Sequence, residues 1–450
     1  MSALDGRDHW APSPPPVIPL DDLPPQPGLR RVKVLHVLTK FAAGAGGNTL
    51  LSAAGMDRER YEVWVAGSDE GPLWDRARQA GLRLAPLGKV KREISPIADL
   101  LVLFRMVRLI RRERFAVVHA HNAKAGFLGR LAAWLCRTPV VLYTLHGRDP
   151  WWQVPDGDDR FEGTMGRGAR WVYLRLERLF RPMTRGFIAV SPQVARDAVE
   201  SRIARPGSVA VAPSAVELDR IPFEPDRSAR RELGIPDDAT LVGTVGRADP
   251  QKAPLDFVRM AHLVGSRKPN AVFVWVGDGE LVDEARAEAA RLGVDVLFTG
   301  YRADAPRIAS SFDVYVVSSR YEGVGRSLTE ALACARPVVA TAVDGVLDVV
   351  RPGATGLLAP PRDPARLAEA VCWMLDHPRE ARRMGEAGRT FVRTLFEPEV
   401  MCAILDRIYS HYLGLSPLQP PMSSPGGSVP DEVRWTVPAW AGSDGPRVTE

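Results

Sequence analysis

The sequence predicts an α/β fold made of two Rossmann-like domains that face each other across a cleft. Three observations support this expectation. The chain of 450 residues is too long for one core of ordinary size. Short apolar runs alternate with helical patterns along most of it, which is typical of parallel sheets with right-handed crossovers. This alternation breaks near residues 213–235, in a stretch rich in proline and charge. Two sheets are therefore expected.

Ten apolar runs predict the strands. Those of the first half are RVKVLHVLTK, YEVWVAGS, FAVVHAHN, PVVLYTLHG and GFIAVS, and those of the second half are TLVGTVGR, AVFVWVGDG, VDVLFTG, DVYVVSS and RPVVATAV. We assign residues 31–218 to an N-terminal domain and residues 219–394 to a C-terminal domain, both Rossmann-like. Residues 1–30 and 415–450 are predicted to be disordered tails, because proline, serine and glycine dominate them.

A last helix is expected over residues 395–414. Pro398 suits a first helical turn, and Val400, Ile404, Ile408 and Tyr412 recur every four residues. Such an apolar face needs a partner surface. We expect the helix to pack back toward the N-terminal domain.

Composition restricts the ligands and the compartment. Hydrophobic residues make up 45% and charged residues 25% of the chain, as in ordinary globular proteins. The net charge of +5 is modest and spread along the sequence, which favours small anionic ligands over nucleic acid. The four cysteines form no CxxC pair, so neither a zinc site nor a disulfide framework is expected. No signal-peptide pattern opens the chain, and a cytoplasmic location is predicted.

Two cations follow the first strand of the second half. Arg247 ends the run LVGTVGR, and Lys252 follows after ADPQ. Because ligands of open parallel sheets gather beyond the carboxyl ends of strands, this pair suits a diphosphate. Solvated loop charges are the alternative.

Two glutamates lie eight residues apart in SRYEGVGRSLTEALACARPVVAT. Glu322 falls in a glycine-rich loop, and Glu330 falls in a helix expected to begin near Ser327, whose N–H groups could face phosphate. The carboxylates could bind sugar hydroxyls. Ser327 and Glu330 also match a capping box, in which Glu330 only bonds the backbone at the start of the helix.

The motifs GRADPQK, VGDGE, FTGYRAD, SSRYEGVGRSLTEALACARPVVAT and TGLLAPPRDP, in this order, resemble the donor-binding domain of family 4 retaining glycosyltransferases. The resemblance covers about residues 31–413. It implies that the N-terminal domain lies on the acceptor side and that the C-terminal domain binds the nucleotide sugar. It implies the GT-B fold and sugar transfer from a nucleoside-diphosphate sugar to a saccharide or lipid-linked acceptor, with no metal and no other cofactor. It implies further that anomeric configuration is retained.

The resemblance also implies roles for individual residues. Arg247 and Lys252 would hold the donor diphosphate, Glu322 would contact the transferred sugar, and Glu330 would bind the nucleotide ribose. His146, in TLHGRD, would line the sugar pocket as part of the catalytic set. Further donor contacts are expected from Gly277, Gly325, Arg326 and Ser327. Tyr301 and Arg302 are weaker candidates for contact with the nucleotide, and a surface charge is the alternative for Arg302.

The N-terminal half supplies the other wall of the cleft. Gly44, Gly46 and Gly47 in FAAGAGGNTL are expected to form a tight turn close to the donor phosphates. His119 and His121 alternate along one strand and so share a face, which is compatible with metal ligation. No third ligand is evident from the sequence, and we expect no metal there.

The segment 89–115 combines an apolar helix face with seven basic residues: Lys89, Lys91, Arg92, Arg108, Arg111, Arg112 and Arg114. It is either a peripheral contact with an anionic membrane or a sheet-packing helix with a solvated basic rim. The connection 148–185, with Trp151, Trp152 and Trp171, is either an acceptor lid or a surface loop.

Several positions depart from the common pattern of the family. Ser214-Ala215 replaces Asn-Gly, Ala253 replaces the glycine after the donor lysine, and Asp344-Gly345 with Asp348 replaces a paired glycine and a glutamate. Two alternatives therefore stay open. One is a sugar-nucleotide epimerase on the same fold, and the other is a catalytically silent subunit that only binds the nucleotide sugar.

Overall fold

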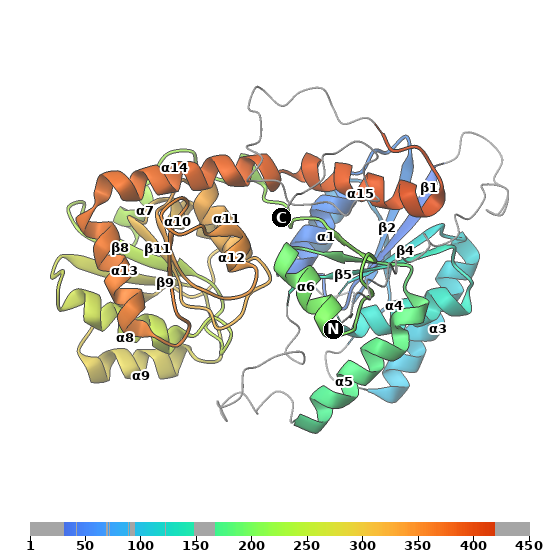
Figure 1. Ribbon diagram of the computed structural model, residues 1–450, viewed down its shortest axis with the longest axis horizontal. Coiled ribbons are helices and arrows are strands. Elements are labelled where there is room, and N and C mark those ends of the chain that lie inside the picture. The colour runs from blue at the N-terminus through green and yellow to red at the C-terminus, as the bar shows by residue number, and fades with distance from the viewer. Residues whose placement is uncertain are drawn as a thin grey trace, which may run out of the picture.

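The computed structural model describes residues 31–41, 43–68, 71, 73–88, 90, 95–121, 123–147 and 167–418. It contains two parallel sheets in two lobes, which confirms the predicted fold class (Figure 1). The chain passes from one sheet to the other between residues 211 and 240. The expected tails, at 1–30 and from 419 onward, lie outside the described residues.

The N-terminal lobe is built on seven strands in the order β3-β2-β1-β4-β5-β6-β7. Its strands are β1 (Val32–Val37), β2 (Tyr61–Gly67), β3 (Arg83–Pro86), β4 (Val117–His121), β5 (Val140–Leu145), β6 (Gly186–Ala189) and β7 (Val209–Val211). Its helices are α1 (Ala43–Gly55), α2 (Leu73–Gln79), α3 (Pro96–Glu113), α4 (Ala123–Leu135), α5 (Arg167–Phe180), η3 (Arg181–Met183) and α6 (Pro192–Glu200).

The C-terminal lobe is built on six strands in the order β10-β9-β8-β11-β12-β13. Its strands are β8 (Thr240–Val245), β9 (Ala271–Val276), β10 (Val296–Phe298), β11 (Val314–Val317), β12 (Val338–Thr341) and β13 (Leu357–Ala359). Its helices are η4 (Leu218–Arg220), α7 (Arg227–Glu232), α8 (Pro254–Gly265), α9 (Val282–Leu292), α10 (Ala305–Ser310), α11 (Arg326–Ala333), α12 (Val346–Val349), α13 (Pro364–Asp376) and α14 (Pro378–Leu395), and α15 (Pro398–Leu413) follows them.

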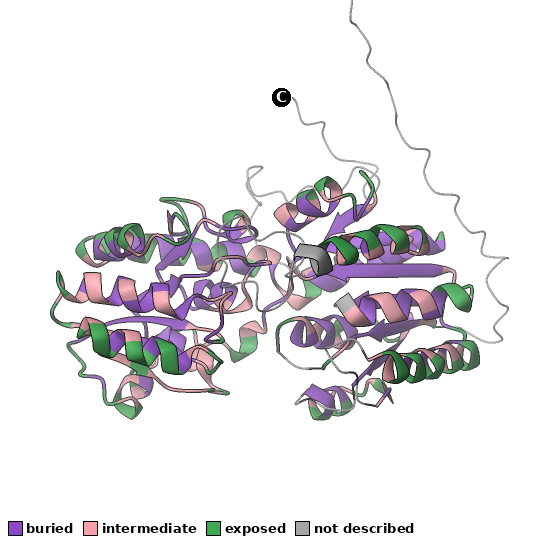
Figure 2. Cartoon of the chain, turned by 90° about the horizontal axis from the view of Figure 1, so that it is seen from below, coloured by how far each residue is buried: buried purple, intermediate pink, exposed green. Residues whose placement is uncertain are grey.

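The central strands are mostly apolar and buried because helices cover both faces of each sheet. Every residue of β4, β5 and β11 is buried, and the buried strands run through the middle of both lobes in Figure 2. Polar side chains within these strands are therefore exceptional. In the first lobe they are mainly histidines, which matter for the site below.

Helix α15 returns to the N-terminal lobe and packs on α1, as expected (Figure 1). The buried face differs in part from the predicted one. Ile408 and Tyr412 are buried, but Val400 and Ile404 are only half-buried, and Met401, Leu405 and Tyr409 take their place. A helical turn of 3.6 residues makes a strict period of four drift off the contact surface.

Residues 415–418 belong to the predicted C-terminal tail, yet they are bonded to the N-terminal lobe. Arg60 donates to the carbonyl of Ser416 at 2.7 Å, and the N–H of Leu418 donates to Asp406 at 2.7 Å. The prediction of a tail that starts at residue 415 is therefore wrong by at least these four residues. The prediction rested on composition, which gives no information about hydrogen bonds made by backbone atoms.

Candidate active site

The candidate site lies where the strand order of each sheet reverses. These switch points fall between β1 and β4 in the first sheet and between β8 and β11 in the second. Crossover connections leave such a point in opposite directions and so open a crevice at the carboxyl ends of the strands. The loops after β5, β8 and β11 carry most of the residues predicted from the sequence.

The loop after β8 presents the two predicted cations in different surroundings. The Arg247 side chain is 68% exposed and pairs with Asp249 at 2.8 Å. Lys252 is largely buried, and its ammonium group forms an ion pair with Glu322. Asp249 also accepts from the backbone N–H of Lys252 at 3.0 Å. Arg247 is therefore available to an incoming anion, whereas Lys252 is held in place.

Ala253, which follows this lysine, has a φ of 50° and a ψ of 63°. This is the left-handed conformation that glycine adopts without strain. The departure from the family pattern at this position therefore keeps the backbone shape that a glycine would favour. Helix α8 then begins at Pro254.

Glu322 is buried, with only 4% of its surface exposed. Besides Lys252, its carboxylate accepts from Ser319 Oγ at 2.8 Å and from Gln251 Nε2 at 3.4 Å. Its backbone N–H donates to Asp344 Oδ2 at 3.0 Å. Asp344, a position that departs from the family pattern, thus supports the loop that carries Glu322.

Glu330 does not form the capping box that the sequence allowed. Helix α11 begins at Arg326 after Gly325, whose φ of 83° and lack of a side chain exclude side-chain capping at this end. Ser327 is consequently the second helical residue. The Glu330 carboxylate instead accepts from Arg326 Nε at 2.9 Å, and burial raises the pKa of Glu330. The capping interpretation is therefore wrong in its geometry.

Arg326 connects the two lobes. Its Nη2 lies 3.3 Å from Glu217 Oε2, and Glu217 also pairs with Arg76 on α2. Gly47 leaves room for this side chain, because a Cβ at that position would lie 1.9 Å from Arg326 Nη1. The guanidinium of Arg326 therefore lies against the glycine-rich segment of the N-terminal lobe.

The glycine-rich segment is not the tight turn that the sequence predicted. Only Gly44 has non-helical angles, with φ 21° and ψ −107°, while Gly46 and Gly47 lie within α1. The expected turn at Gly46 and Gly47 is therefore wrong. Their lack of side chains has a different use, which is close packing of Phe41 and Arg326 against the helix.

His146 follows β5 and lies where the two lobes meet. A Cβ on Gly323 would come within 2.2 Å of the His146 carbonyl oxygen, so the backbones of the two loops touch. Burial lowers the pKa of His146 to about 4, which keeps the ring neutral. His146 thereby lies beside the loop of Glu322.

Behind His146 lies a cluster of histidines, of which the sequence analysis identified two. His119 and His121 do share a face of β4, but His36 on neighbouring β1 joins them, with ring nitrogens of the three within 4.8 Å of one another. The structure therefore brings in a third possible ligand that was not evident from the sequence. Residue 36 is 83 positions before residue 119, and only the β1–β4 pairing brings the rings together.

The remaining donor-side candidates lie around this loop set. Gly277 has a φ of 142° and packs against the carbonyl of Gly246, where a Cβ would come within 2.0 Å. Arg302 is held by Asp304 at 2.8 and 2.9 Å, and Tyr301 is exposed. Their contact with a nucleotide stays a prediction.

Other predictions fall partly outside the described residues. These are the loop with Trp151 and Trp152 and the basic residues Lys89, Lys91 and Arg92. The described part of the loop region is α5, on which Trp171 is exposed. Within the described residues, no helix combines the length and the apolar composition needed to cross a membrane.

Several residues of the site were not predicted from the sequence. Gln251, Ser319 and Asp344 follow strands, so a search of every strand end would have found them. Arg76 and Glu217 have no such marker, since a charged residue on a helix or a linker is ordinary. They meet Arg326 only through the packing of the two lobes.

Comparison with known proteins gives matches in both halves of the chain. Residues 225–391 match the family described as glycosyl transferases group 1, and residues 43–215 match the glycosyl transferase 4-like domain. A 2-deoxystreptamine N-acetyl-D-glucosaminyltransferase of Streptomyces fradiae is 33% identical over 318 residues, which are 66% of this chain and 74% of that protein.

A UDP-Gal:alpha-D-GlcNAc-diphosphoundecaprenol alpha-1,3-galactosyltransferase of Escherichia coli is 28% identical over 323 residues, 70% of this chain and 80% of that protein. Among solved structures, Anabaena Alr3699/HepE in complex with UDP-glucose matches with a TM-score of 0.68 and 20% identity. That match covers 84% of this chain and 100% of the other, and it shows a shared fold.

Proposed function

The chain belongs to the group 1 glycosyl transferases, and on this premise we propose that it moves a sugar from a nucleoside diphosphate to a saccharide acceptor with retention of configuration and without a metal ion. The observation that carries the proposal is the ion pair of Lys252 with Glu322 at the switch point between β8 and β11. It places a cation and a carboxylate side by side where a donor phosphate and its sugar would meet.

In this proposal the donor lies along the carboxyl ends of β8 and β11. Arg247 and Lys252 bind the diphosphate, Glu322 binds hydroxyls of the transferred sugar, and Glu330 binds the ribose. The Glu330 carboxylate already accepts a hydrogen bond from Arg326. The ribose hydroxyls must therefore bind the same carboxylate beside Arg326 or replace it. The exposure of Arg247 fits a side chain that closes on the ligand.

The chemical step follows from the charges. The bond between the anomeric carbon and the phosphate oxygen breaks, and its electron pair stays on the diphosphate. Arg247 and Lys252 stabilise that growing negative charge, which supplies the role that a metal ion has elsewhere. The acceptor hydroxyl bonds to the anomeric carbon from the same face, and its proton passes to the departing phosphate oxygen. Configuration is thereby retained.

Contact between the lobes supports the exclusion of water. His146 and Gly147 touch the loop of Glu322 and Gly323 directly, and Arg326 reaches across to Glu217. A closed site of this kind favours transfer to the acceptor over hydrolysis of the donor.

A thermal-shift panel of nucleoside diphosphates and their sugars tests the donor site. A true donor raises the melting temperature by mass action, and Arg247→Ala should lose that rise. Arg366→Ala, a matched change of an exposed arginine on α13, should keep it. No rise with any nucleotide, or an equal rise in Arg247→Ala, overturns the site assignment.

The products then separate the remaining alternatives. Incubation of the stabilising donor with saccharide acceptors, followed by NMR of the anomeric proton, should give a glycoside of the donor's configuration, and the yield should survive EDTA. An inverted product, or a yield abolished by EDTA, overturns retention or metal independence. Interconversion of the donor without an acceptor identifies an epimerase, and binding without any turnover identifies a silent subunit.

We further propose that helix α3 holds the enzyme at an anionic membrane, where lipid-linked acceptors lie. Ile97, Leu100, Leu101 and Phe104 form one apolar stripe on α3, with Ile97 80% and Phe104 66% exposed. The stripe continues into exposed Arg108, Arg111 and Arg112 on the same face. An apolar stripe beside clustered cations has the chemistry of an interfacial helix. The Escherichia coli relative is named for a diphosphoundecaprenol-linked substrate.

Liposome flotation tests this contact. The chain should float with vesicles that contain anionic lipid, and replacing Arg108, Arg111 and Arg112 by glutamine should reduce the bound fraction. The control replaces three exposed arginines of α14 in the other lobe, Arg379, Arg382 and Arg383, and so removes the same charge. Equal losses in both triple variants, or no binding at all, remove the proposal.

A further inference from the structure

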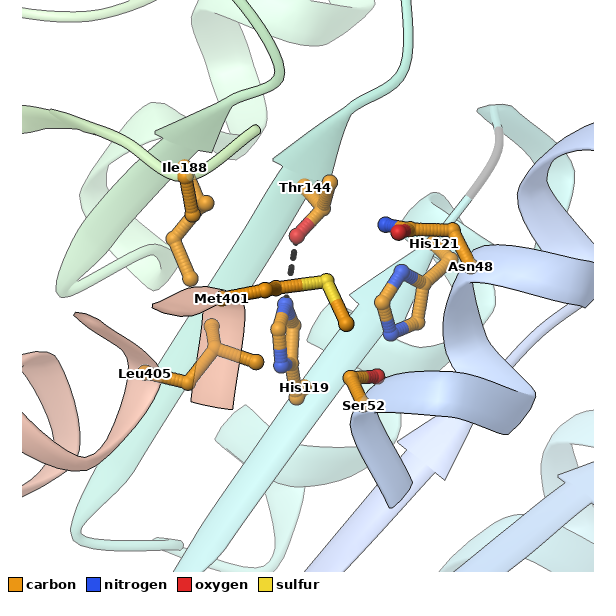
Figure 3. A pocket seen from close by; sticks show the side chains of 9 residues that line it. Asn48, Ser52, His119, His121, Thr144, Ile188, Met401 and Leu405 are labelled. Atoms are coloured by element: carbon orange, nitrogen blue, oxygen red, sulfur yellow. Dashed lines mark hydrogen bonds between the residues drawn. The ribbon is translucent and has the colours of Figure 1, made fainter. Parts of the chain in front are cut away.

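Five side chains of the N-terminal lobe and Tyr409 of α15 form one continuous chain of hydrogen bonds that ends at His146. Thr144 Oγ1 lies 2.5 Å from His119 Nε2, a contact drawn in Figure 3, and His119 Nδ1 lies 2.7 Å from Tyr409 Oη. The longest step, 3.5 Å, joins Tyr409 Oη to His36 Nε2. The chain continues from His36 Nδ1 to His121 Nε2 at 2.9 Å and from His121 Nδ1 to His146 Nε2 at 3.0 Å.

The chain crosses four elements of the fold. Its members come from β1, β4, the end of β5 and, in the case of Tyr409, from α15 near the C-terminus. The helix that returns from the other lobe is thus linked to the residue at the mouth of the site. His119 and His121 also line a small pocket between α1 and α15 (Figure 3).

The four rings are neutral because burial lowers the pKa of each. For His36 the pKa falls to about 3, and for His119 and His121 it falls well below the usual range. A neutral imidazole has one N–H donor and one acceptor nitrogen. Each ring must therefore donate on one side and accept on the other. The Tyr409 hydroxyl has room to accept from both neighbouring rings, but its own O–H would then have no acceptor among the described residues, so it accepts from one ring and donates to the other. All the hydrogen bonds consequently point the same way along the chain, and reversing one reverses the others.

Thr144 sets the direction. If His119 Nε2 donated to Thr144, the buried threonine O–H would need another acceptor, and the structure gives none among the described residues. An unsatisfied buried hydroxyl costs about 1–3 kcal/mol. If Thr144 donates instead, each hydrogen atom from Thr144 to His121 has an acceptor. In that direction every histidine carries its proton on Nδ1.

We infer that Tyr409, His36 and His121 are positioning residues that hold His146 as its Nδ1–H tautomer and so make it a hydrogen-bond donor toward the cleft. On the proposed function, the acceptor is an oxygen of the donor sugar or its phosphate, because His146 lies beside the loop of Glu322. His146 Nε2 is engaged by His121, and its Nδ1 has no hydrogen-bond partner among the described residues, so Nδ1 is the nitrogen left for a ligand.

The same bonds argue against reading His36, His119 and His121 as a metal site. Both ring nitrogens of each of the three already have a protein partner. A metal ion would have to break at least one of these contacts per ligand. The cluster is better suited to fixing protons than to binding a cation.

Proton-detected NMR of the ¹⁵N-histidine-labelled full chain, without any substrate, tests the inference. Neutral imidazole nitrogens with and without a proton have well-separated ¹⁵N shifts, and single histidine variants assign the signals. We expect His36, His119, His121 and His146 to be protonated on Nδ1, with the spectrum unchanged by EDTA. An Nε2–H form of His146, or loss of the pattern on chelation, overturns the inference.

Two variants test the coupling itself. Tyr409→Phe removes the hydroxyl that donates to His36, so His36, His121 and His146 should become mixtures of both tautomers. Tyr61→Phe removes another buried hydroxyl bonded to α15, at Asp406, and should leave all four tautomers unchanged. If Tyr409→Phe fails to fold, Thr144→Val should release His119 in the same way. Unchanged tautomers in both Tyr409→Phe and Thr144→Val refute the relay.

The test of the histidine tautomers is independent of the proposed function. The tautomers are read in the free protein, so the relay can fail while sugar transfer stands. Conversely, the relay can hold in a chain that transfers nothing.

Discussion

The ammonium group of Lys252 and the carboxylate of Glu322 form an ion pair although seventy residues separate them in the sequence. The pair joins the loop after β8 to the loop after β11 at the switch point of the second sheet. Because Glu322 is buried, Lys252 has a structural role in addition to the proposed one in binding phosphate. Arg247, which is exposed, has no such double role.

Arg247→Ala should therefore separate activity from stability. Turnover should fall on the order of 10²-fold if charge stabilisation of the leaving diphosphate matters as proposed. The free energy of unfolding should change by no more than about 0.5 kcal/mol, because the side chain lies at the surface. Initial rates measure the turnover, and urea denaturation measures the free energy of unfolding. Near-normal transfer would contradict the assigned role.

Lys252→Ala should lower both the turnover and the free energy of unfolding. It leaves the Glu322 carboxylate buried without its cation, which costs about 3 kcal/mol of unfolding free energy. The double variant Lys252→Ala with Glu322→Gln should regain much of that stability and none of the activity. Equal stability in the single and double variants would show that the ion pair does not hold the two loops together.

Glu330→Gln should weaken binding of a nucleoside diphosphate. A neutral amide loses the charge-assisted hydrogen bond to the ribose and also the one from Arg326. The rise in melting temperature with the stabilising nucleotide should shrink. Glu369→Gln removes an exposed carboxylate paired on α13 and should leave that rise intact. Lower stability with unchanged nucleotide binding would assign Glu330 a purely structural role.

Gly323→Ala should hinder closure of the site. The new Cβ would lie 2.2 Å from the His146 carbonyl oxygen, which is backbone and cannot swing away. Moving the loops apart by about 1 Å can reduce turnover on the order of 10²-fold. Gly265→Ala is the control, since its Cβ would meet only Phe273 at 3.6 Å. Normal rates in Gly323→Ala would show that the loop contact is not needed for transfer.

Stability should fall as the pH decreases from 6.5 toward 5. The pKa of His36 is lowered to about 3 and that of His146 to about 4, so the folded chain keeps these rings neutral while the unfolded chain protonates them below pH 6.5. Stability is therefore complete above pH 6.5 and is lost by about 1.4 kcal/mol per pH unit for each such histidine. Urea midpoints at several pH values measure this slope. The slope should be shallower in His36→Asn, and a flat profile in the native chain would contradict neutral burial.

Much of the fold was predictable because its central strands are short, mainly apolar runs. All ten predicted runs correspond to strands of the two sheets. The three strands that were missed, β3, β7 and β13, contain three or four residues each and lie at sheet edges. Three or four residues are too few to show a periodic pattern, so such a strand is not distinguished from a loop by its sequence.

The candidate site was also predictable only in part. The sequence by itself determined the two parallel sheets and the positions of Arg247, Lys252, Glu322 and His146 at strand ends, since local pattern and chain order fix both. Tertiary structure alone decided that Glu330 bonds Arg326, that Arg326 reaches Glu217, and that His36 completes a chain of histidines. Those contacts join residues far apart in sequence, and only the pairing of strands and the packing of lobes bring their atoms within hydrogen-bonding distance.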